Sequence, residues 1–414
     1  MKNFYDAAII GAGAAGLAAA EVIAKAGHSV LVIDREQRAG GILNQCIHNG
    51  FGLHCFKEEL TGPEFAGRAA DNALNAGAEL KLNTAVTQIA KNGDNTFTLR
   101  TISAENGLCD ITAKAVMLAT GCRERTRGAI NTPGVRAAGV YTAGTAQKLL
   151  NREGKLPGKS AVIVGSGDIG LIMARRLRWC GIEVKAVVEI MPFASGLTRN
   201  VVQCLHDFDI PLHLAHSVTR ICGKERVTGV DVAPIANGQI DSEKSFHIAC
   251  DTVLFAVGLV PDMSLANELG ISTDPVTSGA LVDADYQTDI PGIFSAGNVL
   301  HVHDLVDFAA LEAARAGEAL VRYINGGTNP EKCEIITAGN LRYCLPQTYF
   351  PERRTVFSFR PSRIGKNGTL TAAINGVEIC RKKLPFIHPA EMITVEIAGE
   401  KLTSGKLEFN LTSE

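Results

Sequence analysis

The sequence predicts an α/β protein that contains two similar strand–helix–strand units and ends in a small all-β module. The pattern Gly-x-Gly-x-x-Gly occurs twice, at residues 11–16 and 165–170. Each copy follows a short apolar run typical of a buried strand and opens a run typical of a helix. After residue 327 the sequence changes to short alternating or β-branched runs, and Asn375-Gly376 between two of them indicates a hairpin turn.

Length, charge and hydropathy restrict the class of protein. A chain of 414 residues exceeds what one hydrophobic core usually serves, so we expect two or three domains. The formal net charge of −2 does not favour binding to nucleic acid or to an anionic membrane surface. Residues 7–20 carry no charged side chain, but the run is too short to span a bilayer. We therefore expect no membrane insertion.

The cysteines indicate a reducing compartment. The chain has 11 of them, scattered without the spacing of iron–sulfur or zinc sites. No secretory leader precedes the first apolar run. We expect free thiols and a cytoplasmic location.

The first glycine pattern lies within residues 6–34, which have the order strand, turn, helix, strand. Gly11 permits the tight turn, Gly13 removes a Cβ that would block a phosphate, and Gly16 lets the helix pack close to the strand. The amide groups at the start of the helix then face the phosphates. Asp34 follows the second strand and can accept hydrogen bonds from ribose hydroxyls. Together these features are typical of a Rossmann-like dinucleotide-binding domain.

The second glycine pattern follows the same logic, and its second strand ends at Glu189. A carboxylate there favours the free 2′-hydroxyl of NAD and repels the 2′-phosphate of NADP, and no pair of arginines follows it. NAD is therefore expected and NADP is less favoured. The alternative is that Glu189 only caps a surface strand.

Four further segments identify a family resemblance. Asp34 is followed after five residues by Gly40-Gly41, MLATG occupies 117–121, FAVG occupies 255–258 and TDIPGIFSAGN occupies 288–298. These segments, in this order, resemble the pyridine nucleotide–disulfide oxidoreductase family of two-dinucleotide-binding flavoproteins. The resemblance covers about residues 1–326.

The resemblance implies FAD at the first glycine pattern and NAD at the second, with the NAD domain inserted in the FAD domain. The implied ranges are 1–152 and 257–330 for the FAD domain, 153–256 for the NAD domain and 340–414 for the small β-rich domain. Residues expected at FAD are Gly11, Gly13, Ala15, Gly16, Asp34, Arg35, Gly41, Val86, Thr120, Gly121, Gly297 and Asn298. Residues expected at NAD are Gly165, Gly167, Asp168, Ile169, Gly170, Glu189 and Gly258.

One departure from the family pattern falls at Asn298, where the family places Asp. The family's carboxylate accepts a hydrogen bond from the ribityl chain of FAD, and an Asn carbonyl can accept the same bond. A neutral bond replaces a charge-assisted one, which weakens binding by about 1 kcal/mol.

The redox cysteine pairs of the family's disulfide reductases are missing. After Gly40-Gly41 the chain reads ILNQCIHNGFGLHCF, with Cys46 and Cys55 nine positions apart. The family runs this segment beside the flavin, so Cys46 and His48 are the expected catalytic residues, with His48 as an acid or base near neutral pH. The alternative is that these residues only line the flavin site and take no part in catalysis.

His301 and His303 have the spacing of two metal ligands, with Asp304 and Asp307 close by. No third ligand at a fixed spacing supports a metal site. We therefore expect hydrogen bonding near the flavin here and no metal. Eight basic residues of the C-terminal module form either a solvated face or a surface for an acidic partner subunit: Arg353, Arg354, Arg360, Arg363, Lys366, Arg381, Lys382 and Lys383.

The expected function is an FAD-dependent, NAD(H)-linked oxidoreductase that passes electrons between nicotinamide, flavin and a small-molecule or protein third party. Without a redox pair, the chain is similar to electron-transfer subunits of amine and amino-acid dehydrogenases, such as those of hydrogen cyanide synthase and sarcosine oxidase. That similarity implies an oligomer and a partner dehydrogenase subunit, including one of the glycerol-3-phosphate type. Two alternatives stay open: a stand-alone disulfide or peroxide reductase using Cys46 and Cys55, and a non-enzymatic flavin-bound assembly protein.

Overall fold

The computed structural model describes residues 3–414 and divides into two compact units. The first unit comprises the chain up to Cys122 together with Pro261–Glu414, and the second comprises Arg123–Val260. The chain passes between the units at β9 (Cys122–Glu124) and β19 (Leu259–Pro261), which pair with each other. The predicted cofactor-domain ranges are not tested by this division and stay predictions.

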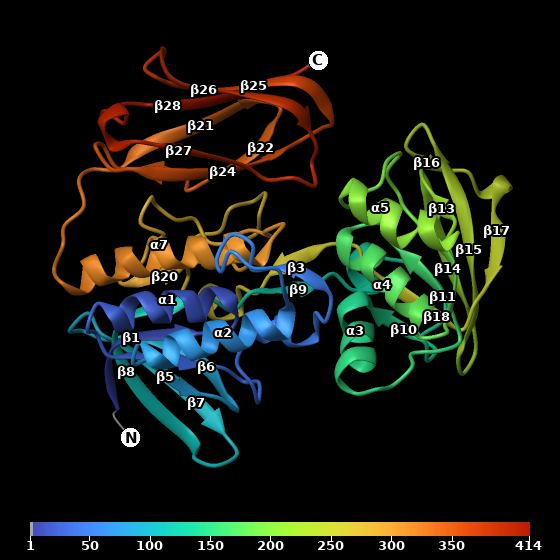
Figure 1. Cartoon of the computed structure of the whole chain (residues 1–414), viewed down its shortest axis with the longest axis horizontal. Helices are drawn as coiled ribbons and strands as arrows, with labels where there is room; N and C mark the ends of the chain where they lie inside the picture. Colours follow the sequence, from blue (N-terminus) through green and yellow to red (C-terminus); the bar gives the residue numbers. More distant parts are fainter. Residues whose placement is uncertain (1–2) are drawn as a thin grey trace. The chain divides into compact units, whose positions relative to one another are not determined.

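The first unit contains a mainly parallel sheet (Figure 1). In spatial order its strands are β5 (Glu79–Lys81), β2 (Val30–Ile33), β1 (Phe4–Ile10), β8 (Gly107–Leu118), β7 (Phe97–Ser103) and β6 (Thr84–Lys91). The short strand β20 (Ile293–Ser295) also pairs with β8 in parallel. The carboxyl ends of β1, β2, β8 and β20 therefore lie at one edge of the sheet, where ligands bind in open α/β sheets.

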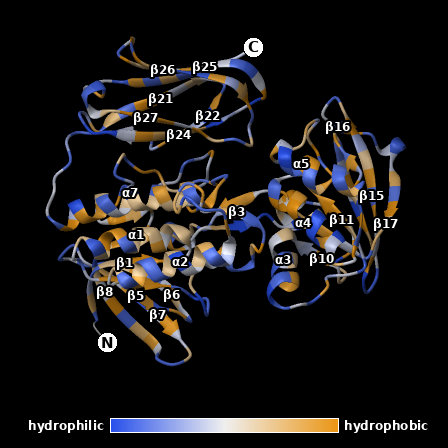
Figure 2. Cartoon of the chain, in the orientation of Figure 1, coloured by the Kyte–Doolittle hydropathy of each residue, from blue (hydrophilic) through white to orange (hydrophobic). Residues whose placement is uncertain are grey.

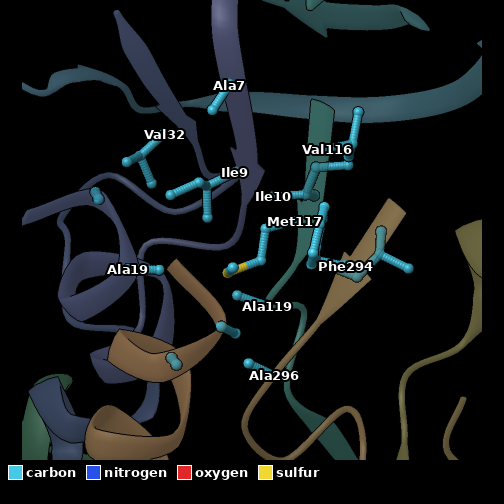
Figure 3. Packing of buried hydrophobic residues seen from close by; sticks show 14 of the residues in the cluster. Ala7, Ile9, Ile10, Ala19, Val32, Val116, Met117, Ala119, Phe294 and Ala296 are labelled. Carbon is cyan, nitrogen blue, oxygen red and sulfur yellow. The ribbon is translucent and has the colours of Figure 1, made fainter. Parts of the chain in front are cut away.

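Three long helices cover this sheet: α1 (Ala14–Lys25), α2 (Gly62–Asn75) and α7 (Val306–Ile324). The helix α1 is rich in alanine and packs closely on its neighbours; a Cβ on Gly317 of α7 would lie 3.1 Å from the carbonyl oxygen of Ala19. Figure 3 shows the core between sheet and helices, where Ile9, Met117 and Phe294 meet. Shorter elements complete the unit: η1 (Gly41–Gln45), β3 (Asn49–Phe51), β4 (Leu60–Thr61) and α6 (Ser264–Glu268).

The second unit contains a parallel sheet of the same kind. Its strands, in spatial order, are β10 (Val140–Thr142), β18 (Thr252–Phe255), β11 (Ser160–Val164), β12 (Glu183–Val188) and β13 (Leu212–His213). Its helices are α3 (Ala143–Arg152), α4 (Asp168–Trp179) and α5 (Thr198–Cys204). An antiparallel sheet follows, made of β14 (His216–Gly223), β15 (Val227–Ala236), β16 (Gln239–Ile240) and β17 (Phe246–Ala249). The prediction of two Rossmann-like domains is confirmed.

The C-terminal part of the first unit is a sandwich of two sheets, as the sequence predicts. One sheet has the order β23 (Thr348–Tyr349), β21 (Cys333–Gly339), β28 (Leu407–Thr412), β25 (Gly365–Ile374) and β26 (Val377–Ile387). The other has the order β22 (Leu341–Leu345), β24 (Thr355–Pro361) and β27 (Ile393–Ile397). Figure 2 shows hydrophobic residues among hydrophilic ones in this part of the chain, and buried residues alternate with more exposed ones along β27 and β28. The hairpin at Asn375-Gly376 is confirmed: Ile374 pairs with Val377, and both turn residues have positive φ.

Ion pairs join the sandwich to the rest of the first unit. Arg360 Nη1 lies 2.7 Å from Asp304 Oδ1, and Arg360 also donates to the carbonyl oxygen of Val302. Arg353 pairs with Asp285, whose side chain is 4% exposed. Four of the eight basic residues of the C-terminal module pair with acids of their own chain: Arg353 and Arg360 as above, Arg354 with Glu396 and Arg381 with Glu378.

No helix within residues 3–414 is both long and apolar enough to cross a membrane.

Candidate functional site

The first glycine loop joins the end of β1 to the start of α1, and its backbone leaves no room for side chains at two positions. Gly11 has a φ of +109°, and a Cβ there would lie 2.3 Å from the carbonyl oxygen of Ala119 at the end of β8. A Cβ on Gly16 would lie 1.8 Å from the carbonyl oxygen of Gly11. These two glycines let strand, helix and neighbouring strand converge.

Gly13 differs because a Cβ there would meet no atom within 4 Å. The space beside it is open, and α1 begins at the next residue without a side-chain cap and without an acidic residue in its first turn. The unpaired amide groups of that turn carry the positive end of the helix dipole. An uncapped helix start facing open space fits a pyrophosphate.

Asp34 is held with its carboxylate against this loop. Its Oδ2 accepts a hydrogen bond from the backbone N–H of Ala12 at 2.7 Å, and its Oδ1 accepts one from Glu36 at 2.8 Å. The side chain is partly exposed, so each oxygen keeps a lone pair for a ligand hydroxyl. Arg35, the next residue, is exposed.

Other residues predicted for FAD gather at the same edge of the sheet. Gly40 donates its N–H to the carbonyl oxygen of Ala12 at 2.6 Å, and a Cβ on Gly41 would lie 3.3 Å from Gly13 Cα. A Cβ on Gly297, just after β20, would lie 2.7 Å from the Cβ of Ala15.

The segment that follows β8 also lies at this edge. A Cβ on Gly121 would face open space, and the Thr120 hydroxyl donates to the carbonyl oxygen of Asp262 at 2.9 Å. Val86 lies on β6, where it pairs with Thr101. Most of the residues predicted for FAD therefore lie at one edge of the sheet, and their roles in binding stay predictions.

The second glycine loop repeats the backbone geometry of the first. A Cβ on Gly165 would lie 2.3 Å from the carbonyl oxygen of Ala256, and one on Gly170 would lie 2.7 Å from that of Gly165. Gly167 has room for a Cβ, whose nearest contact would be 3.9 Å away. Gly258 has a φ of +99° and accepts a hydrogen bond from the N–H of Arg125.

The groups around the second loop are different. The helix α4 begins with Asp168 and Ile169, and Asp168 Oδ1 accepts hydrogen bonds from Leu197 N at 2.9 Å and Asn200 Nδ2 at 2.6 Å. A carboxylate therefore occupies the first turn of this helix and ties the segment after β12 to it.

Glu189, at the end of β12, is buried and surrounded by donors. Its Oε2 accepts hydrogen bonds from the N–H and hydroxyl of Ser166 at 2.9 and 2.6 Å and from the Ser195 hydroxyl at 3.0 Å. Its Oε1 accepts one from Met191 N at 2.9 Å. Both carboxylate oxygens are thus bonded to protein donors, so Glu189 is more than the cap of a surface strand.

The segment after Gly41 contains the two predicted catalytic residues. Cys46 donates its Sγ–H to the carbonyl oxygen of Ile42, and burial raises the pKa of this thiol to about 12. His48 Nδ1 lies 3.0 Å from the carbonyl oxygen of Asn49, and its ring packs 4.9 Å from that of Phe51. The catalytic roles of Cys46 and His48 stay predictions.

Cys55 forms no disulfide with Cys46, and within residues 3–414 every cysteine keeps its thiol. Burial, followed by the nearby Asp307 carboxylate, raises the pKa of Cys55 to about 12. Asp307, in the first turn of α7, also accepts the N–H groups of Gly52, His54 and Cys55, each at 2.9 Å. Sequence reasoning considered Asp307 only as a metal ligand and missed that it anchors this loop.

The two histidines after β20 meet a third group that their spacing did not reveal. The third group is Glu312, which lies in the second turn of α7. Its Oε2 is 2.9 Å from His301 Nε2 and 3.4 Å from His303 Nε2. All three side chains are at most 3% exposed. Sequence reasoning rejected a metal for lack of a third ligand, because nothing in the spacing marks a glutamate that a helix brings back to the pair.

Comparison with known proteins agrees with this arrangement. A family model described as pyridine nucleotide-disulphide oxidoreductase matches residues 5–315. The glutamate synthase [NADPH] small chain of Mycobacterium tuberculosis is 28% identical over 78% of this chain and 67% of its own length. The thioredoxin reductase of Treponema pallidum is 27% identical over 78% of this chain and 99% of its own length.

Two further comparisons bear on fold and organisation. The hydrogen cyanide synthase subunit HcnB of Pseudomonas protegens is 24% identical over 70% of this chain and 65% of its own length. The crystal structure of T. acidophilum thioredoxin reductase superposes with a TM-score of 0.65 at 27% identity, over 77% of this chain and 98% of that one. The family match ends before the C-terminal sandwich.

Proposed function

Because the chain belongs to the pyridine nucleotide–disulphide oxidoreductase family and is an FAD-dependent pyridine nucleotide oxidoreductase, we propose that FAD binds at the first glycine loop and NAD(H) at the second. Electrons then pass between the nicotinamide, the flavin and a third partner. The observation that carries the proposal is the uncapped start of α1 beside the open space at Gly13.

In this proposal, different residues of the first loop contact different parts of FAD. The amide groups at the start of α1 bind the pyrophosphate, and Gly13 lets it approach. Asp34 accepts hydrogen bonds from a ribose, while Gly41, Gly121 and Gly297 wall the site with backbone. When bound, FAD supplies the hydride chemistry, and the protein supplies position and electrostatics.

At the second loop, Glu189 supports NAD(H) over NADP(H). Its buried carboxylate would repel a 2′-phosphate, and its four protein donors hold it in place. A relative's name includes NADPH, so the preference is a property to be measured on this chain. We place the NAD domain at 153–256, with the FAD domain at 1–152 and 257–330.

For the third partner we favour a second subunit over a disulfide substrate. A thiolate is the form that attacks a disulfide, and the pKa values of Cys46 and Cys55 near 12 leave both as thiols at neutral pH. Three large apolar side chains of the same loop face solvent: Ile42, Ile47 and Leu53. We propose that a partner subunit covers these side chains.

We therefore propose an oligomeric electron-transfer subunit of a dehydrogenase complex, of the amine, amino-acid or glycerol-3-phosphate type. The relatives' own names, "small chain" and "subunit", support this reading. A reductase acting on disulfides or peroxides through Cys46 and Cys55 is the second candidate, supported by the thioredoxin reductases among the relatives.

Anaerobic titration of the purified full chain with NADH, combined with thiol counting, tests both candidates. The proposal predicts a yellow protein whose flavin absorbance is bleached by one equivalent of NADH, with no new thiols released. Release of two thiols per chain on reduction would instead establish the disulfide mechanism. A flavin that NADH never reduces would contradict both.

A further inference from the structure

The antiparallel sheet of the second unit carries a cysteine, an aspartate and a histidine on one face. Its strand β15 pairs with β14 on one side and with β17 on the other (Figure 1). Asp231 of β15 is opposite His247 of β17, and Cys222 of β14 is opposite Gly229, two positions before Asp231 on β15. Because side chains alternate between the two faces of a sheet, all three side chains lie on the same face.

The packing of the opposite face fixes this orientation. The residues that alternate with the three side chains are Ile221, Val230 and Ile248. Ile221 and Val230 are fully buried, and Ile248 packs against the same hydrophobic cluster. A shift of one position would turn these apolar side chains toward solvent, so the register is strongly specified. The core therefore holds the cysteine, the aspartate and the histidine together on the outer face.

The functional atoms of this group lie at separations that suit a shared metal ion. Cys222 Sγ is 3.5 Å from Asp231 Oδ2, and His247 Nδ1 is 2.8 Å from Asp231 Oδ1. One ligand atom from each residue lies within 4.8 Å of the other two. A tetrahedral zinc ion with bonds of about 2.0–2.3 Å holds its ligand atoms about 3.5 Å apart. The side chains of His247 and Asp231 are 50% and 32% exposed, so both can make the small shifts that this geometry needs.

Gly229 leaves room for the histidine ring beside the cysteine. A Cβ at this position would lie 2.3 Å from His247 Nε2, closer than to any other atom. The ring therefore lies over residue 229, the position directly opposite Cys222. The φ of Gly229 is not positive, so its backbone conformation does not require glycine. A glycine inside a strand weakens the strand and is typical of places where another group approaches closely.

We propose that Cys222, Asp231 and His247 bind one Zn²⁺ ion. Thiolate and imidazole are the donors that zinc prefers, and a carboxylate oxygen completes three protein ligands, which leave a fourth position for water. The thiol releases its proton to solvent as the sulfur–zinc bond forms, and the imidazole binds through Nδ1 and keeps one proton on Nε2. The thiolate and the carboxylate then balance the two positive charges, and the oxidation state of zinc does not change.

This site is independent of the proposed flavin chemistry. It contains no residue of either glycine loop, and its strands belong to the antiparallel sheet and not to the parallel sheet that carries the second loop. The alternative is that Asp231 and His247 form only a surface ion pair. An exposed pair stabilises a fold little, and it accounts neither for the thiol within 3.5 Å of the carboxylate nor for the glycine beneath the ring.

Titration of the purified full chain with Co²⁺, in anaerobic buffer without added thiols, tests the ligand set. Cobalt takes the place of zinc in tetrahedral sites and, unlike zinc, absorbs visible light. The proposal predicts d–d bands in the red, where oxidised flavin does not absorb, and a sulfur-to-cobalt band in the difference spectrum, both complete at one ion per chain and abolished by Zn²⁺. The group of His301, His303 and Glu312 contains no sulfur, so cobalt bound there gives no sulfur band. Absence of the sulfur band would overturn the proposal.

Zinc affinity of matched variants gives the second test. Partners outside the ligand sphere of a metal are worth about 10–100-fold in affinity, so Cys222→Ser, which removes a ligand, should weaken zinc binding by about a hundredfold or more. Gly229→Ala should weaken it by about tenfold, because the new Cβ displaces the histidine ring. Cys180→Ser is the control, since Cys180 is a partly buried cysteine of the same unit outside the group and should leave the affinity unchanged. Wild-type affinity in Cys222→Ser, or an equal loss in Cys180→Ser, would overturn the proposal.

Discussion

The two glycine loops share one backbone and differ in what surrounds it. A Cβ at the first glycine of either loop would lie 2.3 Å from the carbonyl oxygen of an alanine, Ala119 or Ala256, at the end of the neighbouring strand. Neither helix has a side-chain cap, but α1 carries no acidic residue in its first turn, whereas α4 begins with Asp168 and its loop bonds the buried Glu189. Because the backbone is shared, we expect both loops to bind dinucleotides. Because the surroundings differ, we expect one nucleotide to be resident and the other to exchange.

The largest expected effect comes from adding a methyl group where helix and strand converge. Gly16→Ala would place a Cβ 1.8 Å from a backbone oxygen, against 2.7 Å for Gly170→Ala. Overpacking of this kind costs about 3 kcal/mol in the first case and about 1 kcal/mol in the second. Denaturant unfolding followed separately by flavin fluorescence and by circular dichroism measures both. Equal losses in the free energy of unfolding would mean that helix and strand pack equally closely at the two loops.

A smaller effect is expected where a carboxylate ties a loop to a helix start. Asp307 is 1% exposed and accepts three backbone N–H groups, so Asp307→Asn should lower the free energy of unfolding by about 2 kcal/mol. Asp168 is partly exposed, so Asp168→Asn should lower it by about 1 kcal/mol. Limited proteolysis within residues 49–57 should increase only in the Asp307 variant. Cleavage there at the wild-type rate would contradict the anchoring role.

We expect the nucleotide preference to depend on Glu189 and not on Asp34. Glu189→Gln removes the charge that repels a 2′-phosphate and keeps one acceptor oxygen for the Ser166 and Ser195 donors, and it should raise kcat/KM for NADPH relative to NADH on the order of tenfold. The ratio of the two kcat/KM values for flavin reduction is the measurement. Asp34→Asn should leave that ratio unchanged, and a change there would mean that the assignment of the two loops is reversed.

The smallest effect is expected at Cys46. With a pKa of about 12 the thiolate is scarce at neutral pH, so alkylation of Cys46 by iodoacetamide should be slow at pH 8 and should quicken steadily as the pH rises toward 11. Cys46→Ser should leave NADH-dependent flavin reduction within about twofold of wild type, because reduction of the flavin needs no thiolate. Rapid alkylation near pH 7 would show that Cys46 is a thiolate at neutral pH and would support the disulfide mechanism.

The sequence could predict what local geometry enforces. A Cβ would meet backbone atoms at four positions of the two loops: Gly11, Gly16, Gly165 and Gly170. Only glycine fits there, so the glycine pattern predicts the loop geometry. The hairpin at Asn375-Gly376 is readable for the same reason, since both residues have positive φ.

The sequence could not predict contacts between distant segments. Glu312 reaches His301 because α7 turns back over β20, and Asp307 binds amide groups more than 250 positions earlier. Arg353 and Arg360 looked like part of a basic face, yet each pairs with an acid from the segment between β19 and α7. Such pairs depend on how the sandwich packs on the sheet domain, which no periodicity in the chain records.

The matched variants Gly13→Ala and Gly167→Ala test most directly whether the first loop holds a resident FAD and the second an exchanging NAD(H). Neither added methyl would clash with the protein, because the nearest atom is beyond 4 Å in the first case and 3.9 Å away in the second. The measurement is bound FAD per chain after purification, followed by anaerobic NADH. We predict that Gly13→Ala folds but lacks FAD, whereas Gly167→Ala keeps FAD that NADH reduces poorly. Full flavin content in Gly13→Ala, or loss of flavin from Gly167→Ala, would contradict the account.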